Sequence, residues 1–290
     1  MARNQPFPNT EDDMEFALST GSLYTYGVDR CFDLAVRSGF DGVELLVDQR
    51  WDTRQPDHLK GLVDRYGLPI TAIHSPFFFP PDWPTDQPSL IQKSVGLAQA
   101  VGARTLVHHL PLRAGYVVLT TGTWRANLPI WGWDRDRPYR DWLLNGYQEL
   151  QARTDVTLCI ENLPAKRFLS VKWSLHRWNT VEAITRFPSL TMDTTHLGTW
   201  GLDPVEVYAR WRGKINHVHL SNFDGREHRR PEQGALRLDR LLALLARDGY
   251  GGTICLELHP DTLEAGSPDD RVVQLLRESL QYCRSRAGVR

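Results

Sequence analysis

The chain has 290 residues, of which 41% are hydrophobic and 24% charged, and its formal net charge is -1. A near-neutral chain offers no overall electrostatic attraction for nucleic acid or an anionic membrane surface. No apolar run approaches the roughly 20 residues of a transmembrane helix, and the N-terminus lacks the basic-then-apolar layout of a signal peptide. The cysteines (Cys31, Cys159, Cys255 and Cys283) show no paired spacing. We therefore expect a cytoplasmic globular protein with reduced thiols.

Short apolar runs alternate with amphipathic segments along almost the whole chain. Residues 1–15 are polar and are expected to form a loose leader. Strands are predicted at 16–20, 42–46, 69–74, 104–109, 157–161, 189–193, 214–220 and 252–258. Helices are predicted at 29–38, 56–66, 89–101, 139–153, 180–186, 204–211, 236–247 and 268–284. No composition change marks a second domain, so residues 16–290 are expected to fold as one unit.

Strict alternation of strands and helices indicates an α/β fold with a parallel sheet. Eight such units favour closure into a single (β/α)8 TIM barrel. An open doubly wound sheet is the alternative, although the first strand is not followed by the Gly-rich turn typical of that fold.

The predicted connections differ at the two ends of this barrel. Those that lead into strands are short and contain Gly, whereas residues 77–83, 112–137 and 166–178 form long, aromatic-rich loops after strands. These loops lie at the carboxyl ends of the strands, where barrel enzymes have their active sites. Two interpretations remain open: the aromatic side chains form the wall or lid of a pocket, with Trp124 contacting a substrate, or they pack against each other or a second subunit in a homo-oligomer.

Four predicted strands carry a metal-binding type of side chain at or near their carboxyl ends: Glu161, Asp193, His219 and Glu257. Side chains alternate along a strand, so all four can point into the mouth of the barrel. Three carboxylates without a cation would repel one another. Together with one imidazole they suit a single divalent cation such as Mn²⁺, Mg²⁺, Co²⁺ or Zn²⁺.

The motifs around these residues resemble those of the xylose isomerase-like TIM barrel superfamily, which includes sugar isomerases and epimerases, dehydratases, and endonuclease IV, an AP endonuclease of family 2. They are Ile160-Glu161-Asn162, Met192-Asp193-Thr-Thr-His196, His217-Val-His219-Leu-Ser-Asn222 and Leu256-Glu257. The resemblance implies that Glu161, Asp193, His219 and Glu257 bind one metal. It also implies that the two glutamates flank the substrate and that His196 contacts its hydroxyl groups.

Further histidines match the endonuclease branch of that superfamily. The resemblance implies that His74, His109 and His228 would bind a second and a third zinc there. Arg226 stands where that branch has an aspartate, and a cation at this position argues against a complete trinuclear site. His108 competes with His109, which we prefer, and His217, one layer deeper than His219, is expected to be a hydrogen-bonded core residue.

Basic residues also cluster after predicted strands, with Lys166 and Arg167 in one loop and Arg226, Arg229 and Arg230 in another. One interpretation is a solvated loop surface. The other is a substrate-binding role for Lys166 and Arg226 toward a phosphate or carboxylate.

The leading functional hypothesis is a metal-dependent isomerase or epimerase of a sugar, sugar phosphate or related polyol, acting through an enediolate. Glu161 and Glu257 would exchange protons with the substrate, and His196 would orient a hydroxyl. A dehydratase acting through the same enediolate is a related hypothesis. The alternative is a phosphoester hydrolase with two or three zinc ions bound by His74, His109 and His228 as well. A non-catalytic binding protein is the third hypothesis. In each enzymatic case the partner is a small molecule, with neither nucleic acid nor membrane expected.

Overall fold

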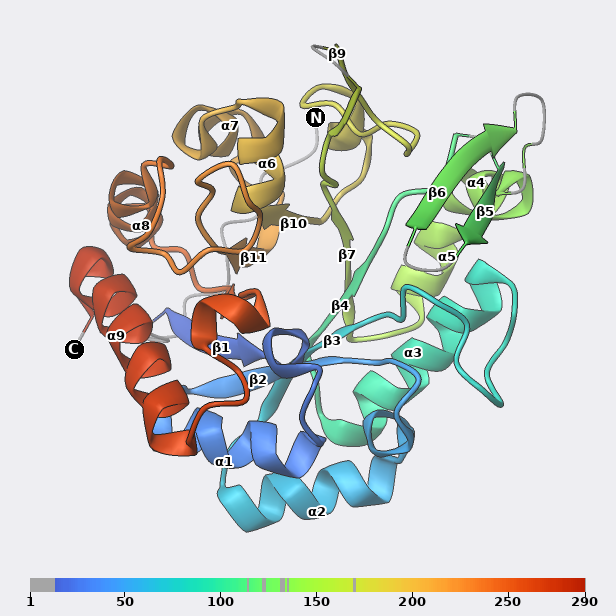
Figure 1. Ribbon diagram of the computed structural model, residues 1–290. Helices are drawn as coiled ribbons and strands as arrows, with labels where there is room; N and C mark the ends of the chain where they lie inside the picture. Colours follow the sequence, from blue (N-terminus) through green and yellow to red (C-terminus); the bar gives the residue numbers. More distant parts are fainter. Residues whose placement is uncertain are drawn as a thin grey trace.

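The computed structural model describes residues 14–113, 115–121, 124–130, 134, 136–168 and 171–289. Eight parallel strands close into a barrel in the order β1-β12-β11-β10-β7-β4-β3-β2 (Figure 1). They are β1 (Glu15–Ser19), β2 (Gly42–Leu46), β3 (Ile70–His74), β4 (Thr105–His108), β7 (Thr157–Glu161), β10 (Leu190–Asp193), β11 (Ile215–Leu220) and β12 (Thr253–Leu256). The (β/α)8 barrel is confirmed, and the open sheet is excluded because β1 pairs with both β2 and β12.

Helices surround the strands in chain order (Figure 1). Within the described residues they are α1 (Val28–Ser38), α2 (Pro56–Tyr66), α3 (Gln87–Val101), α4 (Arg137–Asn145), α5 (Tyr147–Ala152), α6 (Thr194–Trp200), α7 (Pro204–Trp211), α8 (Leu238–Arg247) and α9 (Asp269–Ala287). Single 3₁₀ turns follow β1 (Thr20–Leu23), β2 (Trp51–Arg54) and β12 (Pro260–Leu263).

Two predicted helices differ from those observed. The helix expected at 139–153 is divided at Gly146, where a Cβ atom would lie 2.7 Å from the Trp142 ring. The helix expected at 180–186 is only a 3₁₀ turn at Ala183–Arg186. An unpredicted helix, α6, comes directly after β10 and before α7, where Asp193 caps it by accepting a hydrogen bond from the backbone N–H of His196.

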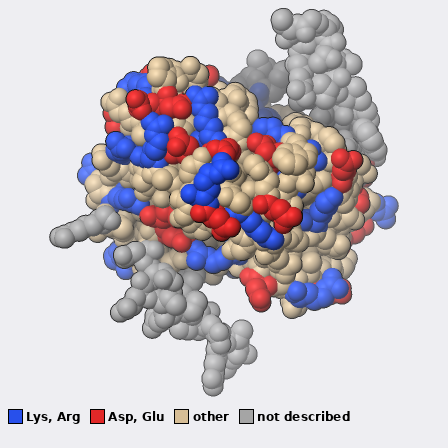
Figure 2. Space-filling model, turned by 90° about the horizontal axis from the view of Figure 1, so that it is seen from below, with Lys and Arg blue, Asp and Glu red and all other residues tan. Residues whose placement is uncertain are grey.

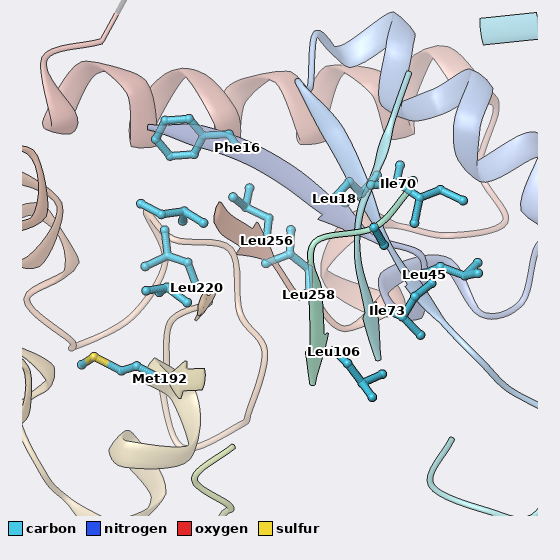
Figure 3. Close-up of a cluster of buried hydrophobic side chains, with 14 of the residues drawn as sticks. Phe16, Leu18, Leu45, Ile70, Ile73, Leu106, Met192, Leu220, Leu256 and Leu258 are labelled. Atoms are coloured by element: carbon cyan, nitrogen blue, oxygen red, sulfur yellow. The ribbon is translucent and has the colours of Figure 1, made fainter. Parts of the chain in front are cut away.

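Apolar side chains on the outer face of the strands pack under the helices and form the main core. Phe16, Leu18, Leu106, Met192, Leu220 and Leu256 are among the fully buried residues of this cluster (Figure 3). The alternate residues of the same strands point to the other face, so His217 and His219 face the barrel interior while Val218 and Leu220 face the helices. This division explains how a strand can be strongly apolar and still deliver polar groups to one point.

The long segments after β4 and β7 contain short hairpins. β5 (Gly115–Thr121) pairs with β6 (Trp124–Ile130), and β8 (Lys166–Phe168) pairs with β9 (Val171–Trp173). Trp131 and Trp133 lie outside the described residues, as does the side chain of Trp124 in β6. Phe78 and Trp51, which follow β3 and β2, are 64% and 63% exposed. A pocket wall, a lid or a subunit contact made by the aromatic loops stays a prediction.

Residues 1–13 of the expected leader lie outside the described residues, whereas Met14 is buried and β1 begins at Glu15. In the described part of the chain no helix has the length and apolarity needed to cross a membrane. Basic and acidic side chains are interspersed on the face shown in Figure 2. That face therefore has no broad basic area of the kind that binds nucleic acid.

Candidate metal centre

Three strands and the residue after a fourth bring four metal-binding side chains to one end of the barrel. Glu161 and Asp193 are the last residues of β7 and β10, His219 lies near the end of β11, and Glu257 directly follows β12. One donor atom from each lies within 4.8 Å of the other three. The four residues singled out in the sequence as one metal site are thus brought together.

The Nδ1 atom of His219 lies close to all three carboxylates of this group. It is 3.0 Å from Glu161 Oε1, 3.0 Å from Glu257 Oε2 and 3.9 Å from Asp193 Oδ2. A ring nitrogen carries at most one proton, so it cannot satisfy three carboxylate oxygens by hydrogen bonding. The same four atoms would all be ligands of a cation placed between them.

Asp193 shows most clearly that the donor set fits a cation. Its Oδ1 accepts a hydrogen bond of 2.7 Å from the backbone N–H of His196, but its buried Oδ2 has no hydrogen-bond partner among the described residues. Burial, followed by the charges of Glu161 and Glu257, raises the pKa of this carboxyl well above its usual value. A divalent cation would compensate both the burial and the repulsion.

The two glutamates differ from Asp193 in their electrostatics. Burial alone would raise the pKa of Glu161, but the charge of His219 and hydrogen bonds from His109, His219 and His74 outweigh it and lower that pKa well below its usual value. Burial is likewise outweighed at Glu257, mainly by His219 and His228, which lower its pKa to about 2. Both glutamates are therefore ionised at neutral pH.

Glu161 also belongs to a second group of possible metal ligands, together with His74 and His109. His74 Nε2 and His109 Nε2 lie 3.3 Å and 2.9 Å from Glu161 Oε2. His108 points elsewhere, with Nδ1 3.0 Å from the Tyr139 hydroxyl, and burial lowers its pKa to about 3. Adjacent residues at the end of β4 thus face opposite sides, and His109 is the one that reaches the site.

A third group consists of Asp193, His196 and His228. His196 Nδ1 lies 2.8 Å from the carbonyl oxygen of Asn162, and His228, in a left-handed backbone conformation with φ 56°, has Nδ1 3.1 Å from the carbonyl oxygen of Glu257. Position 226 is an arginine and offers no carboxylate to this group, whereas Glu227 Oε2 lies 3.9 Å from His196 Nε2.

The two basic residues expected to bind substrate are exposed. Arg226 forms an ion pair of 3.2 Å with Asp224, and its side chain is 72% exposed. Lys166 is exposed at the start of β8. Neither belongs to a donor group of the site. Their substrate-binding role, like that of Trp124, stays a prediction.

Two acids near the site, Glu44 and Glu227, were missed in the sequence, and Phe77 comes from the predicted aromatic loop 77–83. Glu44 of β2 is fully buried and contacts both His217 and His219. Glu227 Oε2 lies 3.9 Å from His196 Nε2, and the ring of Phe77 packs against those of His74 and His109 with centroid distances of 4.8 Å and 4.9 Å. A single acid within the apolar run Gly42–Leu46 was the only available signal for Glu44.

Curated relatives align with nearly the whole chain. A protein of Mycobacterium leprae (strain TN) is 28% identical over 296 residues, which covers 94% of this chain and 97% of the relative. A protein of Mycobacterium tuberculosis (strain ATCC 25618 / H37Rv) is also 28% identical with the same coverage. Both are described as uncharacterized, so they assign no activity.

Solved structures with the same fold are named for different chemistries. The 3-keto-D-glucoside 4-epimerase of E. coli has a TM-score of 0.66 at 18% identity, covering 94% of this chain and 100% of that one. D-allulose 3-epimerase from Methylomonas sp. has a TM-score of 0.65 at 15% identity, with 95% and 98% covered. An AP endonuclease of family 2 from Brucella melitensis has a TM-score of 0.61 at 20% identity, with 86% and 94% covered.

At these identities the solved structures show the shared barrel. The family itself is shown by a match of residues 32–286 to the family described as xylose isomerase-like TIM barrel. This protein therefore belongs to the xylose isomerase-like TIM barrel family.

Proposed function

We propose that this protein is a divalent-metal-dependent isomerase or epimerase of a sugar, sugar phosphate or related polyol. The observation that carries the proposal is the convergence of Glu161, Asp193, His219 and Glu257 within 4.8 Å, with one carboxylate oxygen of Asp193 left without a hydrogen bond. This oxygen-rich set suits Mn²⁺, Mg²⁺, Co²⁺ or Zn²⁺. When bound, the cation would supply positive charge that stabilises an enediolate formed from a carbonyl and its neighbouring hydroxyl.

The two glutamates would move the proton. The side chain of Glu257 is 16% exposed, whereas those of Glu161 and Asp193 are 2% and 0% exposed. Glu257 is thus the most accessible carboxylate of the site, and in its ionised form it can accept a proton from a substrate carbon. Glu161, on the other side of β10 and β11, would complete the acid/base pair.

His196 would orient the substrate. Its Nδ1 is engaged by the backbone carbonyl of Asn162 at 2.8 Å, which leaves Nε2 directed away from that anchor. Burial lowers the pKa of His196 to about 4, so the ring is neutral at pH 7. A neutral ring whose Nδ1 is held in this way can form a hydrogen bond with a sugar hydroxyl through Nε2.

A phosphoester hydrolase is the second candidate, favoured by the additional donor groups around His74 and His109 and around His196 and His228. Two or three cations at these groups would activate water for attack on phosphorus. The exposed Arg226, paired with Asp224, weighs against a complete third site.

The decisive experiment measures metal content per chain by plasma mass spectrometry on protein purified without added metal, for the wild type and His228→Ala. One equivalent, retained in the variant, supports the isomerase or epimerase. Two or three equivalents, of which one is lost in the variant, would favour the hydrolase. Retention of no metal, even after Mn²⁺ or Zn²⁺ is added back, would contradict both.

An activity assay separates the remaining chemistries. Ketoses and their phosphates are incubated with the enzyme in D₂O, and deuterium at the carbon beside the carbonyl is measured by NMR. Incorporation with a new epimer or isomer, absent in Glu257→Gln, supports the proposal. Loss of water from the substrate would indicate a dehydratase instead, and cleavage of bis(p-nitrophenyl) phosphate would indicate a hydrolase.

A further inference from the structure

Glu44 is a buried carboxylate inside the barrel that contacts His219, one of the four residues of the metal site. Glu44 belongs to β2, which is separated from β11 by β1 and β12 in the barrel order. Its Oε2 lies 2.8 Å from His217 Nε2 and 3.0 Å from His219 Nε2, and all three side chains are 0% exposed. The contact therefore crosses the interior and joins residues 175 positions apart in the chain.

The two nitrogens of His219 face different partners. Nδ1 faces Glu161 and Glu257 at 3.0 Å, and Nε2 faces Glu44. An imidazole that binds a cation through one nitrogen carries its proton on the other, and an ionised carboxylate can only accept a hydrogen bond. A carboxylate at Nε2 therefore keeps the proton on Nε2. The Nδ1 lone pair is then free to bind a cation held by the three carboxylates of the metal site.

We propose that Glu44 is a positioning residue that holds His219 in the tautomer and ring orientation required to bind a divalent cation through Nδ1. The inference rests on the metal site of the proposed function. His217 has a supporting part, because it donates to the same Oε2 atom and so fixes the carboxylate between two rings. Glu44 would not touch the substrate, so its effect reaches the reaction only through His219.

The same residues could be taken for a metal site of their own, since Glu44, His217, His219 and Cys255 have donor atoms within 4.8 Å of one another. Glu44 Oε2 already has two imidazole partners at hydrogen-bond distance. Carboxylates hydrogen-bonded to the distal nitrogen of a metal-binding histidine typically contribute 10- to 100-fold to metal affinity. The positioning role accounts for both contacts without a second cation.

The test is calorimetric titration of metal-free protein with Mn²⁺ alone. Glu44→Gln keeps the shape of the side chain and removes its charge, and Glu44→Leu removes the acceptor as well. Thr191→Val is the matched control, because Thr191 is equally buried in β10 and is not one of the four donors. We expect one equivalent in all four proteins, an affinity about 10-fold weaker in Glu44→Gln and up to about 100-fold weaker in Glu44→Leu, and little change in Thr191→Val.

Unchanged affinity in Glu44→Gln and Glu44→Leu would overturn the inference while leaving the proposed metal site intact. A second equivalent of Mn²⁺ that is lost in Glu44→Gln and in Cys255→Ala would also overturn it, since the cluster would then be a metal site itself. Thermal unfolding of each metal-free variant shows whether it is folded.

Histidine NMR gives a readout that is independent of metal binding. In metal-free wild type labelled with ¹⁵N-histidine we expect a slowly exchanging Nε2–H proton on His219, lost in Glu44→Leu and retained in Thr191→Val. If the wild type bound no cation, the proposed function would fail, yet this proton would still report the Glu44 contact. If the proton is absent from the wild type, the positioning inference fails by itself.

Discussion

Asp193→Asn should stabilise the metal-free protein while abolishing its response to metal. Asn keeps the side-chain oxygen that caps α6, where Asp193 Oδ1 accepts from His196 N at 2.7 Å. Its amide group replaces Oδ2, which has no hydrogen-bond partner among the described residues, and faces Glu161 and Glu257 as a donor. An unsatisfied buried polar group costs about 1–3 kcal/mol. We therefore expect a gain of about 1–3 kcal/mol in the free energy of unfolding without metal.

The effect has a defined pH dependence. Because burial and the neighbouring glutamates raise the pKa of Asp193 in the folded state, folding favours the protonated carboxyl. The stability that the wild type gains from protonated Asp193 is present at low pH. It is lost as the pH rises through the range between the unfolded and folded pKa values of this carboxyl. The stability difference between Asp193→Asn and the wild type should therefore increase from pH 4 toward neutral pH.

The assay is thermal unfolding with EDTA and with Mn²⁺. At about 2 °C per kcal/mol for a chain of this size, the variant should unfold roughly 2–6 °C above the wild type in EDTA. Mn²⁺ at a hundred times its Kd should stabilise the wild type by about 2.7 kcal/mol and the variant hardly at all. Asp203→Asn is the control, because Asp203 caps α7 outside the site. A variant less stable than the wild type in EDTA, or one that Mn²⁺ still stabilises fully, would refute the reasoning.

Three further predictions concern other parts of the molecule. Burial lowers the pKa of His108 to about 3, so the stability that its neutral ring contributes above pH 6.5 should be lost as the pH falls toward 3. The free energy of unfolding in urea should therefore fall less between pH 7 and pH 5 in His108→Gln than in the wild type, and an equal fall in both would contradict this. Leu18→Ala, in the fully buried core, should cost about 2–5 kcal/mol in unfolding free energy with metal stoichiometry unchanged, whereas a lost metal equivalent would show that core and site are not separable. Arg226→Ala removes an exposed ion pair with Asp224 and should change stability by less than about 1 kcal/mol; a KM raised only for phosphorylated substrates would support an anion-binding role, and equal KM values for both substrate types would exclude it.

Local sequence patterns were sufficient for the parts of the fold that depend on neighbouring residues. Period-two apolar runs located all eight barrel strands to within about two residues, and the alternation of strands with helices predicted closure of the barrel. The family resemblance, carried by motifs at four strand ends, is confirmed by the match of residues 32–286. These features were predictable because side-chain alternation and the common direction of parallel strands determine which residues reach the mouth of the barrel.

Tertiary structure decided the features that depend on contacts between distant strands. The apolar run Gly42–Leu46 contains one glutamate, and nothing nearby in sequence indicates that it meets His219. Whether His108 or His109 reaches Glu161 depended on where β4 ends. The sequence by itself thus determined the barrel and the set of candidate ligands, because both follow from short-range periodicity. Only the closed barrel decided which buried charges face one another, because it brings together strands that are far apart in the chain.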